Sequence, residues 1–205
     1  MLAGRLLGRP AAAVETGTSP RGAPLAGPLA VSITHTAGLV VAAASDRADR
    51  IGIDVERLGR TTRPLAIARR HFTFAEAAAL GALPAADRKK PFLRLWTLKE
   101  AWGKAAGVAV PAALPRIGFR AAGLVAPGRV VSPVPDALAT PPWLRERAPS
   151  TWEFWVLRVG EHTIAAAILG AGRPSPPPNV LTWGGTQTSK ALPGDAVSHP
   201  RLLRT

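Results

Sequence analysis

The chain of 205 residues contains no cysteine and no long apolar run. The absence of cysteine excludes disulfide bonds and thiolate metal sites, and it suits a reducing compartment, so we predict a cytoplasmic location. No apolar stretch reaches the roughly 18 residues that a membrane-spanning helix needs. The N-terminal residues also lack the continuous apolar segment of a secretion signal. The sequence therefore predicts a protein without a membrane partner.

Acidic residues are scarce relative to basic ones. Lys and Arg number 26 against 13 Asp and Glu, which gives a net charge of +13. Such a charge favours acidic partners: nucleic acid, anionic lipid, a phosphate-rich small molecule or an acidic protein. A biased coding composition, rich in Arg, Ala, Pro and Gly, is the alternative explanation of the charge.

Apolar periodicity predicts both strands and helices along the chain. The expected strands are 29–36, 38–45, 51–58, pieces within 116–121 and 128–133, and a hairpin over 151–169. The expected helices are the end of one within 1–14, a second at 65–81 and a third at 87–106. Gly81 and Gly107 occupy the positions of C-terminal helix caps. Residues 17–28 are predicted to form a turn-rich loop, and residues 173–205 a disordered, proline-rich tail.

The strand at 51–58 carries two carboxylates on one face. Side chains two residues apart share a face of a strand, so Gly52, Asp54 and Glu56 lie opposite the apolar Ile53 and Val55. Two like charges so close together raise one pKa or require a cation, and Mg²⁺ with its oxygen ligands would meet that need. The alternative is a solvated strand face flanked by basic residues.

The helix at 92–107 adds a third carboxylate. Trp96, Glu100 and Lys104 follow one another at intervals of four residues and form one stripe. Glu100 and Lys104 could be a simple surface pair, because Glu before Lys is the favourable order. Trp96 is a residue type usually buried in part, however, and Lys99 adds a second ammonium. The set therefore also suits a metal-bridged phosphate at the edge of a core.

The segment SITHT at 32–36 ends the first expected strand. Alternation places Ser32, Thr34 and Thr36 on one face and Ile33 and His35 on the other. A lone histidine in an apolar strand is commonly a core residue with its hydrogen bonds satisfied. A hydroxyl and an imidazole at a strand end can also hold a phosphate, so both interpretations stay open.

Three motifs in this order resemble the Sfp-type 4′-phosphopantetheinyl transferases. They are SITHT, the strand GIDVE at 52–56 and the helix WTLKEAWGK at 96–104. The segment RRHFTFAEAAAL between the last two resembles a further helix start of that family. The resemblance covers roughly residues 20–170. Members transfer the phosphopantetheine group of coenzyme A to a serine of an apo acyl or peptidyl carrier protein, which is acidic.

The resemblance also implies roles for individual residues. Asp54, Glu56 and Glu100 would ligate Mg²⁺, and Thr34, His35, Lys99 and Lys104 would contact coenzyme A phosphates. Lys104 would lie near the transferred phosphoryl group. Attack of an alcohol on a diphosphate needs charge neutralisation, in-line positioning and a proton acceptor. Glu100 is one candidate acceptor and a metal-bound water molecule is another.

The family fold is a pseudo-twofold pair of α+β lobes, so we predict an α+β protein of that kind. Only 31 residues precede Ser32, which implies an incomplete first lobe. We therefore expect residues 1–50 to be a remnant of the N-terminal lobe and residues 51–172 to be the C-terminal lobe with the metal-binding motifs. Residues 173–205 would be the tail. The lysine of the family's GKP motif is replaced by Ala23.

Two other functions remain open on the sequence alone. The short first lobe allows a truncated, non-catalytic homologue that binds coenzyme A or a carrier protein. The basic charge allows a nucleic-acid-binding module, in which aromatic residues would stack on bases. Against this module, Trp96, Trp102, Trp152 and Trp155 lie in apolar periodic elements, and the acidic strand would repel phosphate. We therefore predict no nucleic-acid partner.

Overall fold

The computed structural model describes residues 2–115, 117–119, 128–130, 133–135, 151–170, 181–182 and 190–191. The chain divides into two compact units, Met1–Ser175 and Pro176–Thr205. In the second unit, β11 (Leu181–Thr182) pairs antiparallel with β12 (Lys190–Ala191), and most of the expected tail lies outside the described residues. The first unit contains the motifs and all the elements discussed below.

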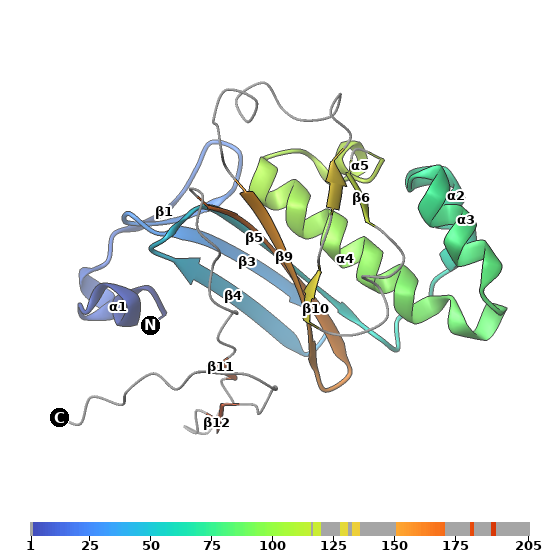
Figure 1. Ribbon diagram of the computed structural model, residues 1–205. Helices are drawn as coiled ribbons and strands as arrows, with labels where there is room; N and C mark the ends of the chain where they lie inside the picture. Colours follow the sequence, from blue (N-terminus) through green and yellow to red (C-terminus); the bar gives the residue numbers. More distant parts are fainter. Residues whose placement is uncertain are drawn as a thin grey trace. The chain divides into compact units, whose positions relative to one another are not determined.

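The first unit mixes helices and strands, as expected for an α+β protein (Figure 1). Its helices are α1 (Leu2–Leu7), α2 (Pro64–His71), α3 (Phe74–Ala82), α4 (Lys89–Ala106) and α5 (Val110–Ala113), with short 3₁₀ turns at Ala11–Ala13 and Ala85–Asp87. Its strands are β1 (Thr16–Thr18), β2 (Pro24–Ala26), β3 (Ala30–Thr36), β4 (Leu39–Ser45), β5 (Ala48–Arg57), β6 (Ile117–Phe119), β7 (Gly128–Val130), β8 (Pro133–Pro135), β9 (Thr151–Val159) and β10 (His162–Gly170). No described helix is both long and apolar enough to cross a bilayer.

An antiparallel sheet in the order β5, β10, β9, β7 forms the centre of this unit. The expected hairpin over 151–169 is present as β9 and β10, and it turns at Gly160, whose φ is 53°. Strand β10 also pairs with β5, so that Asp54 lies opposite Ala165 and Glu56 lies opposite Thr163. Because directly opposite side chains share a face, the acidic face of β5 continues across β10 and β9.

Helix α4 packs on that same face, over β5 and β10 (Figure 1). Its buried residues Leu95, Leu98 and Trp102 join Phe154 and Val156 of β9 in the hydrophobic core. Gly52 is the point of closest approach, because a Cβ there would lie 2.0 Å from Ala101 O. The glycine of the GIDVE motif therefore lets the helix backbone rest directly on the strand, which fixes the distance between Asp54 and the residues of α4.

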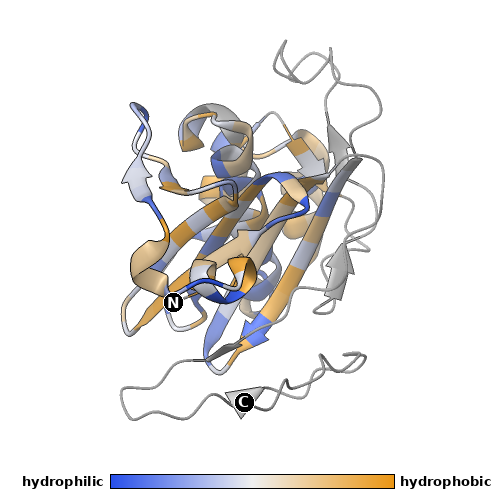
Figure 2. Cartoon of the chain, turned by 90° about the vertical axis from the view of Figure 1, so that its left-hand side faces the viewer, coloured by the Kyte–Doolittle hydropathy of each residue, from blue (hydrophilic) through white to orange (hydrophobic). Residues whose placement is uncertain are grey.

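The hairpin of β3 and β4 lies beside the free edge of β5. The hydroxyl of Ser32 accepts a hydrogen bond from the Ile53 N–H at 3.1 Å. A side chain of β3 therefore supplies the acceptor that a neighbouring strand would otherwise give to this backbone N–H of β5. Ser32 and Thr34 are buried while Ile33 is 53% exposed, which confirms the predicted alternation. Seen from the side where α1 lies, apolar and polar residues alternate along the strands (Figure 2).

Three local expectations were wrong. Residues 65–81 form two helices, because Thr73 begins α3 with a capping box: its hydroxyl accepts from the Glu76 N–H, and the Glu76 carboxylate accepts from the Thr73 N–H. Gly81 consequently lies inside α3 and does not cap it. Gly107 does end α4, with φ of 67°. The expected loop at 17–28 contains most of the short hairpin of β1 and β2. The sequence did not predict this hairpin, because backbone pairing forms it and its strands lack an alternating apolar pattern.

The mixed fold is thus present, while the pseudo-twofold relation between lobes and the incomplete first lobe stay predictions. Residues 50 and 51, where we expect the lobes to meet, lie within β5. The tail is expected from residue 173, and the second compact unit begins at Pro176.

Replacing Gly52 with Ala is expected to destabilise the protein by about 1–3 kcal/mol, because the new methyl group overlaps the backbone of α4. Gly17→Ala is the matched control, since no atom lies within 4 Å of a Cβ at that position. Urea denaturation followed by circular dichroism measures both variants. Equal stability of the two variants would contradict the close contact between β5 and α4.

Candidate functional site

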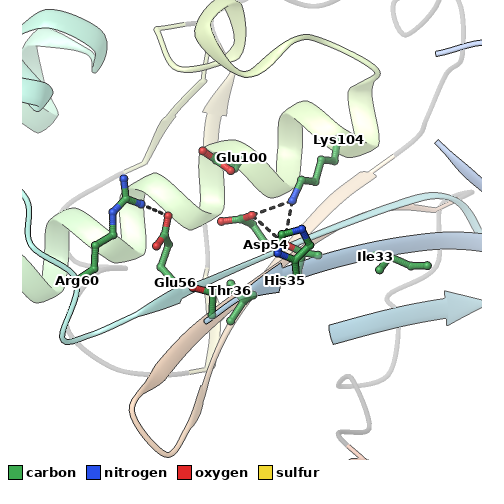
Figure 3. Close-up of a pocket in the computed structure, with 10 residues that line it drawn as sticks. Ile33, His35, Thr36, Asp54, Glu56, Arg60, Glu100 and Lys104 are labelled. Carbon is green, nitrogen blue, oxygen red and sulfur yellow. Dashed lines mark hydrogen bonds and ion pairs between the residues drawn. The ribbon is translucent and has the colours of Figure 1, made fainter. Parts of the chain in front are cut away.

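A cavity of about 500 Å³ opens where β3, β5 and α4 meet (Figure 3). It is lined by ten residues: Ile33, Thr34, His35, Thr36, Asp54, Val55, Glu56, Arg60, Glu100 and Lys104. The structure therefore brings together residues from all three motifs, which are separated by up to about 70 positions in the sequence. Of the seven residues predicted to form the site, only Lys99 does not line it.

Asp54, Thr34 and Lys104 form one hydrogen-bonded cluster at the base of the cavity (Figure 3). Lys104 Nζ donates to Asp54 Oδ1 at 2.8 Å and to Thr34 Oγ1 at 3.1 Å. Thr34 Oγ1 in turn donates to Asp54 Oδ1 at 3.2 Å. Lys104 Nζ also donates to Ile53 O at 3.1 Å, so the backbone carbonyl of Ile53 has a partner as well as its N–H. The lysine thus lies partly buried against β3 and β5, with its charge held at the base of the cavity.

Glu56 is held by Arg60, which follows β5 by three residues. The two side chains form an ion pair, and the Arg60 guanidinium lies 5.6 Å from the centre of the Trp96 ring. Burial raises the pKa of Glu56, and the nearby Asp54 raises it further, while Arg60 opposes both effects. Arg60 therefore supplies part of the countercharge that the paired carboxylates of β5 require.

Glu100 reaches the cavity from α4 and has the most perturbed carboxyl group. Its pKa is raised from 4.5 to about 8, first by burial and then by the nearby Asp54 carboxylate, which repels its negative charge. Glu56 adds a smaller repulsion, and Lys104 opposes the shift. Asp54 and Glu56 affect the pKa of Glu100 because all three carboxyl groups line one cavity (Figure 3).

The donor groups suit a hard divalent cation, although they do not form a closed ligand cluster. Among the described residues, no group of three or more His, Asp or Glu side chains is close enough to hold a metal ion. Asp54 Oδ2, however, is buried and has no hydrogen-bond partner in that part of the chain. An unpaired buried carboxylate oxygen beside two other carboxyl groups is the environment that a cation with oxygen ligands would stabilise. These donor types are the ones that a divalent cation such as Mg²⁺ prefers, and ligation by Asp54, Glu56 and Glu100 stays a prediction.

His35 and Thr36 form the outer wall of the cavity, at the end of β3. His35 is exposed, so the interpretation as a core histidine is wrong. The strand places its imidazole on the face opposite Thr34, and both residues line the cavity. A phosphate contact by His35 or Thr34 stays a prediction.

The structure places Lys99 in the core, away from the cavity. Its side chain is fully buried, and Nζ donates to Glu76 at 2.8 Å, to Leu114 O at 2.7 Å and to Ile117 O. All three donors of the ammonium group are therefore used within the protein. The phosphate contact predicted for Lys99 is corrected accordingly, because neighbouring positions on a helix point in directions about 100° apart.

Sequence reasoning missed Arg60 as a residue of the cavity. Arg60 lies in the irregular segment after β5, where neither a strand nor a helix periodicity predicts the direction of a side chain. Arg60 is four residues after Glu56, but this spacing predicts neighbouring side chains only inside a helix. The one available signal was the need of two adjacent carboxylates for a countercharge.

The pKa of Glu100 predicts a proton linked to metal binding. Between pH 4.5 and about 8, Glu100 keeps its proton in the folded protein, whereas the unfolded chain has released it. The contribution of Glu100 to the free energy of unfolding is therefore complete below pH 4.5 and is lost as the pH rises to about 8. A divalent cation ligated by Glu100, as the resemblance implies, would displace this proton. Calorimetry at pH 7 in buffers of different ionisation enthalpy is expected to show release of up to about one proton per ion bound.

Glu100→Gln is expected to release fewer protons than the natural protein, whereas Glu161→Gln serves as the control because Glu161 is 71% exposed. A binding heat that does not depend on the buffer would contradict the linkage between Glu100 and the ion.

The fold and the cavity together describe an α+β protein in which carboxylate, ammonium and hydroxyl groups meet where a helix packs on a strand. The sequence model of the 4′-phosphopantetheinyl transferase superfamily matches residues 50–167, which is more than half of the chain. The chain therefore belongs to the 4′-phosphopantetheinyl transferase superfamily. This confirms the family expected from the three motifs.

A curated relative agrees with this assignment. The chain is similar to the 4′-phosphopantetheinyl transferase HetI of Nostoc sp., with 37% identity over 79 residues. The match covers 38% of this chain and 33% of the relative. The similarity thus spans about a third of the length of that protein.

Proposed function

We propose that the protein transfers the 4′-phosphopantetheine group of coenzyme A to a serine of an apo acyl or peptidyl carrier protein, with Mg²⁺ as the cofactor. One observation carries the proposal: in a member of this superfamily, Asp54, Glu56, Glu100 and Lys104 line a single cavity. The basic charge of the chain, +13, suits an acidic carrier protein as the second substrate.

Three carboxylates would hold the ion: Asp54, Glu56 and Glu100. When bound, Mg²⁺ would neutralise the diphosphate of coenzyme A. Lys104 adds a positive charge at the base of the cavity, where it would orient the phosphoryl group, and Thr34 and His35 would contact the phosphates from β3. Arg60 lines the same cavity and would be free to contact an anionic group once Glu56 turns toward the ion.

The reaction requires one proton acceptor. The serine oxygen would form a bond to the phosphorus that carries the pantetheine arm, the diphosphate bond would break, and 3′,5′-adenosine bisphosphate would leave with the electron pair. The serine proton needs a base with a pKa near the working pH. Glu100 lines the cavity and is one candidate acceptor, and a water molecule is the alternative.

The non-catalytic homologue remains the competing proposal, and the cavity residues argue against it. A protein that only binds coenzyme A gains little from a buried carboxylate whose second oxygen has no hydrogen-bond partner among the described residues. Base stacking by tryptophan is also disfavoured, since Trp102 is 2% exposed and Trp96 packs against the rings of Phe72 and Phe92. These contacts support the transferase over the nucleic-acid-binding module.

Intact mass spectrometry tests the proposed function. The purified protein, incubated with coenzyme A, Mg²⁺ and an apo carrier protein, is expected to add one phosphopantetheine mass to the carrier. Omission of Mg²⁺ with added chelator should prevent the addition. A carrier that stays unmodified across several acyl and peptidyl carriers would contradict the proposal and favour the non-catalytic homologue.

A further inference from the structure

Thr163 carries a buried polar group that the described site does not use. It is the second residue of β10 and is 4% exposed. Its Oγ1 is buried and has no hydrogen-bond partner among the residues that the structure describes. Most buried polar groups in native proteins are paired, because an unpaired one destabilises the fold. An unpaired hydroxyl in the sheet that carries the site is therefore a candidate for a role in function.

Glu56 is the neighbour of Thr163 on the acidic strand. The antiparallel register of β5 and β10 places the two residues directly opposite each other. Side chains in such a pair point to the same face, with their Cβ atoms about 4.5–5.5 Å apart. Glu56 lines the cavity and Thr163 does not, so the hydroxyl lies beside the carboxylate but outside the cavity lining.

Trp96 of α4 brings a second unused donor to the same carboxylate. Arg60 pairs with Glu56 and lies 5.6 Å from the centre of the Trp96 ring, so the indole is close to both side chains. Burial is the main influence that raises the pKa of Glu56, and Trp96 is near enough to oppose it. The Nε1 atom of Trp96 is nevertheless buried without a hydrogen-bond partner in the described part of the chain. An indole nitrogen can only donate, so it needs a nearby oxygen as acceptor.

Arg60 holds the carboxylate of Glu56 in this structure (Figure 3). The ion pair uses Oε1 of Glu56, and the Arg60 side chain is 40% exposed, so water can replace the carboxylate around the guanidinium. Arg60 also lies in the irregular segment between β5 and α2, whereas Thr163 lies within a strand and Trp96 within a helix. The two unused donors are therefore fixed by regular structure, while the occupied donor belongs to a segment that can adjust.

We propose that Thr163 and Trp96 are positioning residues for Glu56. When the carboxylate leaves Arg60, one of its oxygens accepts hydrogen bonds from Thr163 Oγ1 and Trp96 Nε1, and the other oxygen points into the cavity. Outer hydrogen bonds of this kind orient the carboxylates that bind metal ions. The inference rests on the proposed function, in which Glu56 is one of three carboxylates that hold Mg²⁺. Neither positioning residue lines the cavity, so both act through Glu56.

Thr163→Val tests the hydroxyl, because it keeps the branched shape and removes the donor. The rate of carrier modification and the affinity for Mg²⁺, measured by intact mass spectrometry and calorimetry, are each expected to fall about tenfold. The stability in urea is expected to stay equal or increase, because the change removes an unpaired buried group. Thr163→Ser keeps the hydroxyl and should restore both values, and Thr18→Val, at an exposed position of β1, should change neither.

Nuclear magnetic resonance of the full-length protein labelled with ¹⁵N tests the contact without turnover. The indole N–H signal of Trp96, assigned with Trp96→Phe, is compared in Arg60→Met and in Arg60→Met/Glu56→Met. Both variants lack the guanidinium near the ring, so they differ only in the carboxylate. The signal of Arg60→Met is expected downfield of the other, because only there can the indole donate to Glu56.

The outcomes separate this inference from the proposed function. If the natural protein modifies a carrier, natural turnover in Thr163→Val or equal indole signals in the two Arg60 variants overturns the positioning role and leaves the transferase proposal intact. A loss of turnover that Thr163→Ser does not restore, or that lower stability accompanies, assigns Thr163 a structural role and also overturns it. If the natural protein modifies no carrier, the proposed function is wrong and the positioning role falls with it.

Discussion

Asp54→Asn is expected to lower the rate of carrier modification at least about 100-fold while leaving the fold intact. Asp54 is buried and lines the cavity, and its Oδ2 has no hydrogen-bond partner in the part of the chain that the structure describes. An asparagine keeps the shape and an oxygen that accepts from Thr34 and Lys104, but it removes the negative charge that Mg²⁺ requires. Loss of several kcal/mol of charge stabilisation in the transition state corresponds to at least this factor in rate.

Three measurements on this variant distinguish a metal ligand from a structural residue. Intact mass spectrometry gives the rate of modification, circular dichroism the fold, and calorimetry the affinity for Mg²⁺. Asp46→Asn, an exposed acid after β4, is the matched control and should keep full activity. Turnover of Asp54→Asn within about threefold of the natural protein would reject Asp54 as a ligand. Inactivity with unchanged Mg²⁺ affinity would reassign Asp54 to positioning Lys104.

The strand geometry of the site could be predicted because strands have a strict period of two. The alternation in SITHT and in GIDVE predicted that Thr34 shares a face with Ser32 and that Asp54 shares one with Glu56, while the structure shows that Thr34 and Asp54 are both buried. Gly52 shows what the pattern could not reveal. The glycine is required by the backbone of α4, which lies about 50 positions later in the sequence, and only the packed structure shows that contact.

The limits of helix periodicity explain the errors at Lys99 and at residues 65–81. A helical stripe tells which residues share a face, but it does not tell which face the rest of the protein covers. Glu100 and Lys99 are adjacent charged residues, and the sequence alone gives no reason why one faces the cavity and the other the core. Lys99 faces the core because its ion-pair partner, Glu76 of α3, lies there. Thr73, three residues before Glu76, forms a capping box with it, and this pair indicates a helix start inside the expected helix.

Lys99→Met is expected to destabilise the protein by about 3–5 kcal/mol, although it replaces a charged side chain with an apolar one of similar length. The variant leaves Glu76 charged and buried, because the carboxylate keeps hydrogen bonds from Thr73 and the Phe119 N–H but loses its countercharge. The carbonyl groups of Leu114 and Ile117 also lose their donor. Removal of one partner of a buried ion pair has a cost of this size.

A double-mutant cycle tests this explanation. Glu76→Gln alone should also destabilise, since it leaves the Lys99 ammonium group without a negative partner, and the combined variant should be less unstable than the sum of the two changes. Lys89→Met, at the first residue of α4, is the control and should change the stability by less than about 0.5 kcal/mol. Urea denaturation measures the natural protein and all four variants. Additive effects of Lys99→Met and Glu76→Gln would mean that the two residues do not act as a pair, and that Lys99 holds only the carbonyl groups after α5. Coupling between them would instead show that this buried ion pair joins α3 to α4, the helix that presents Glu100 to the cavity.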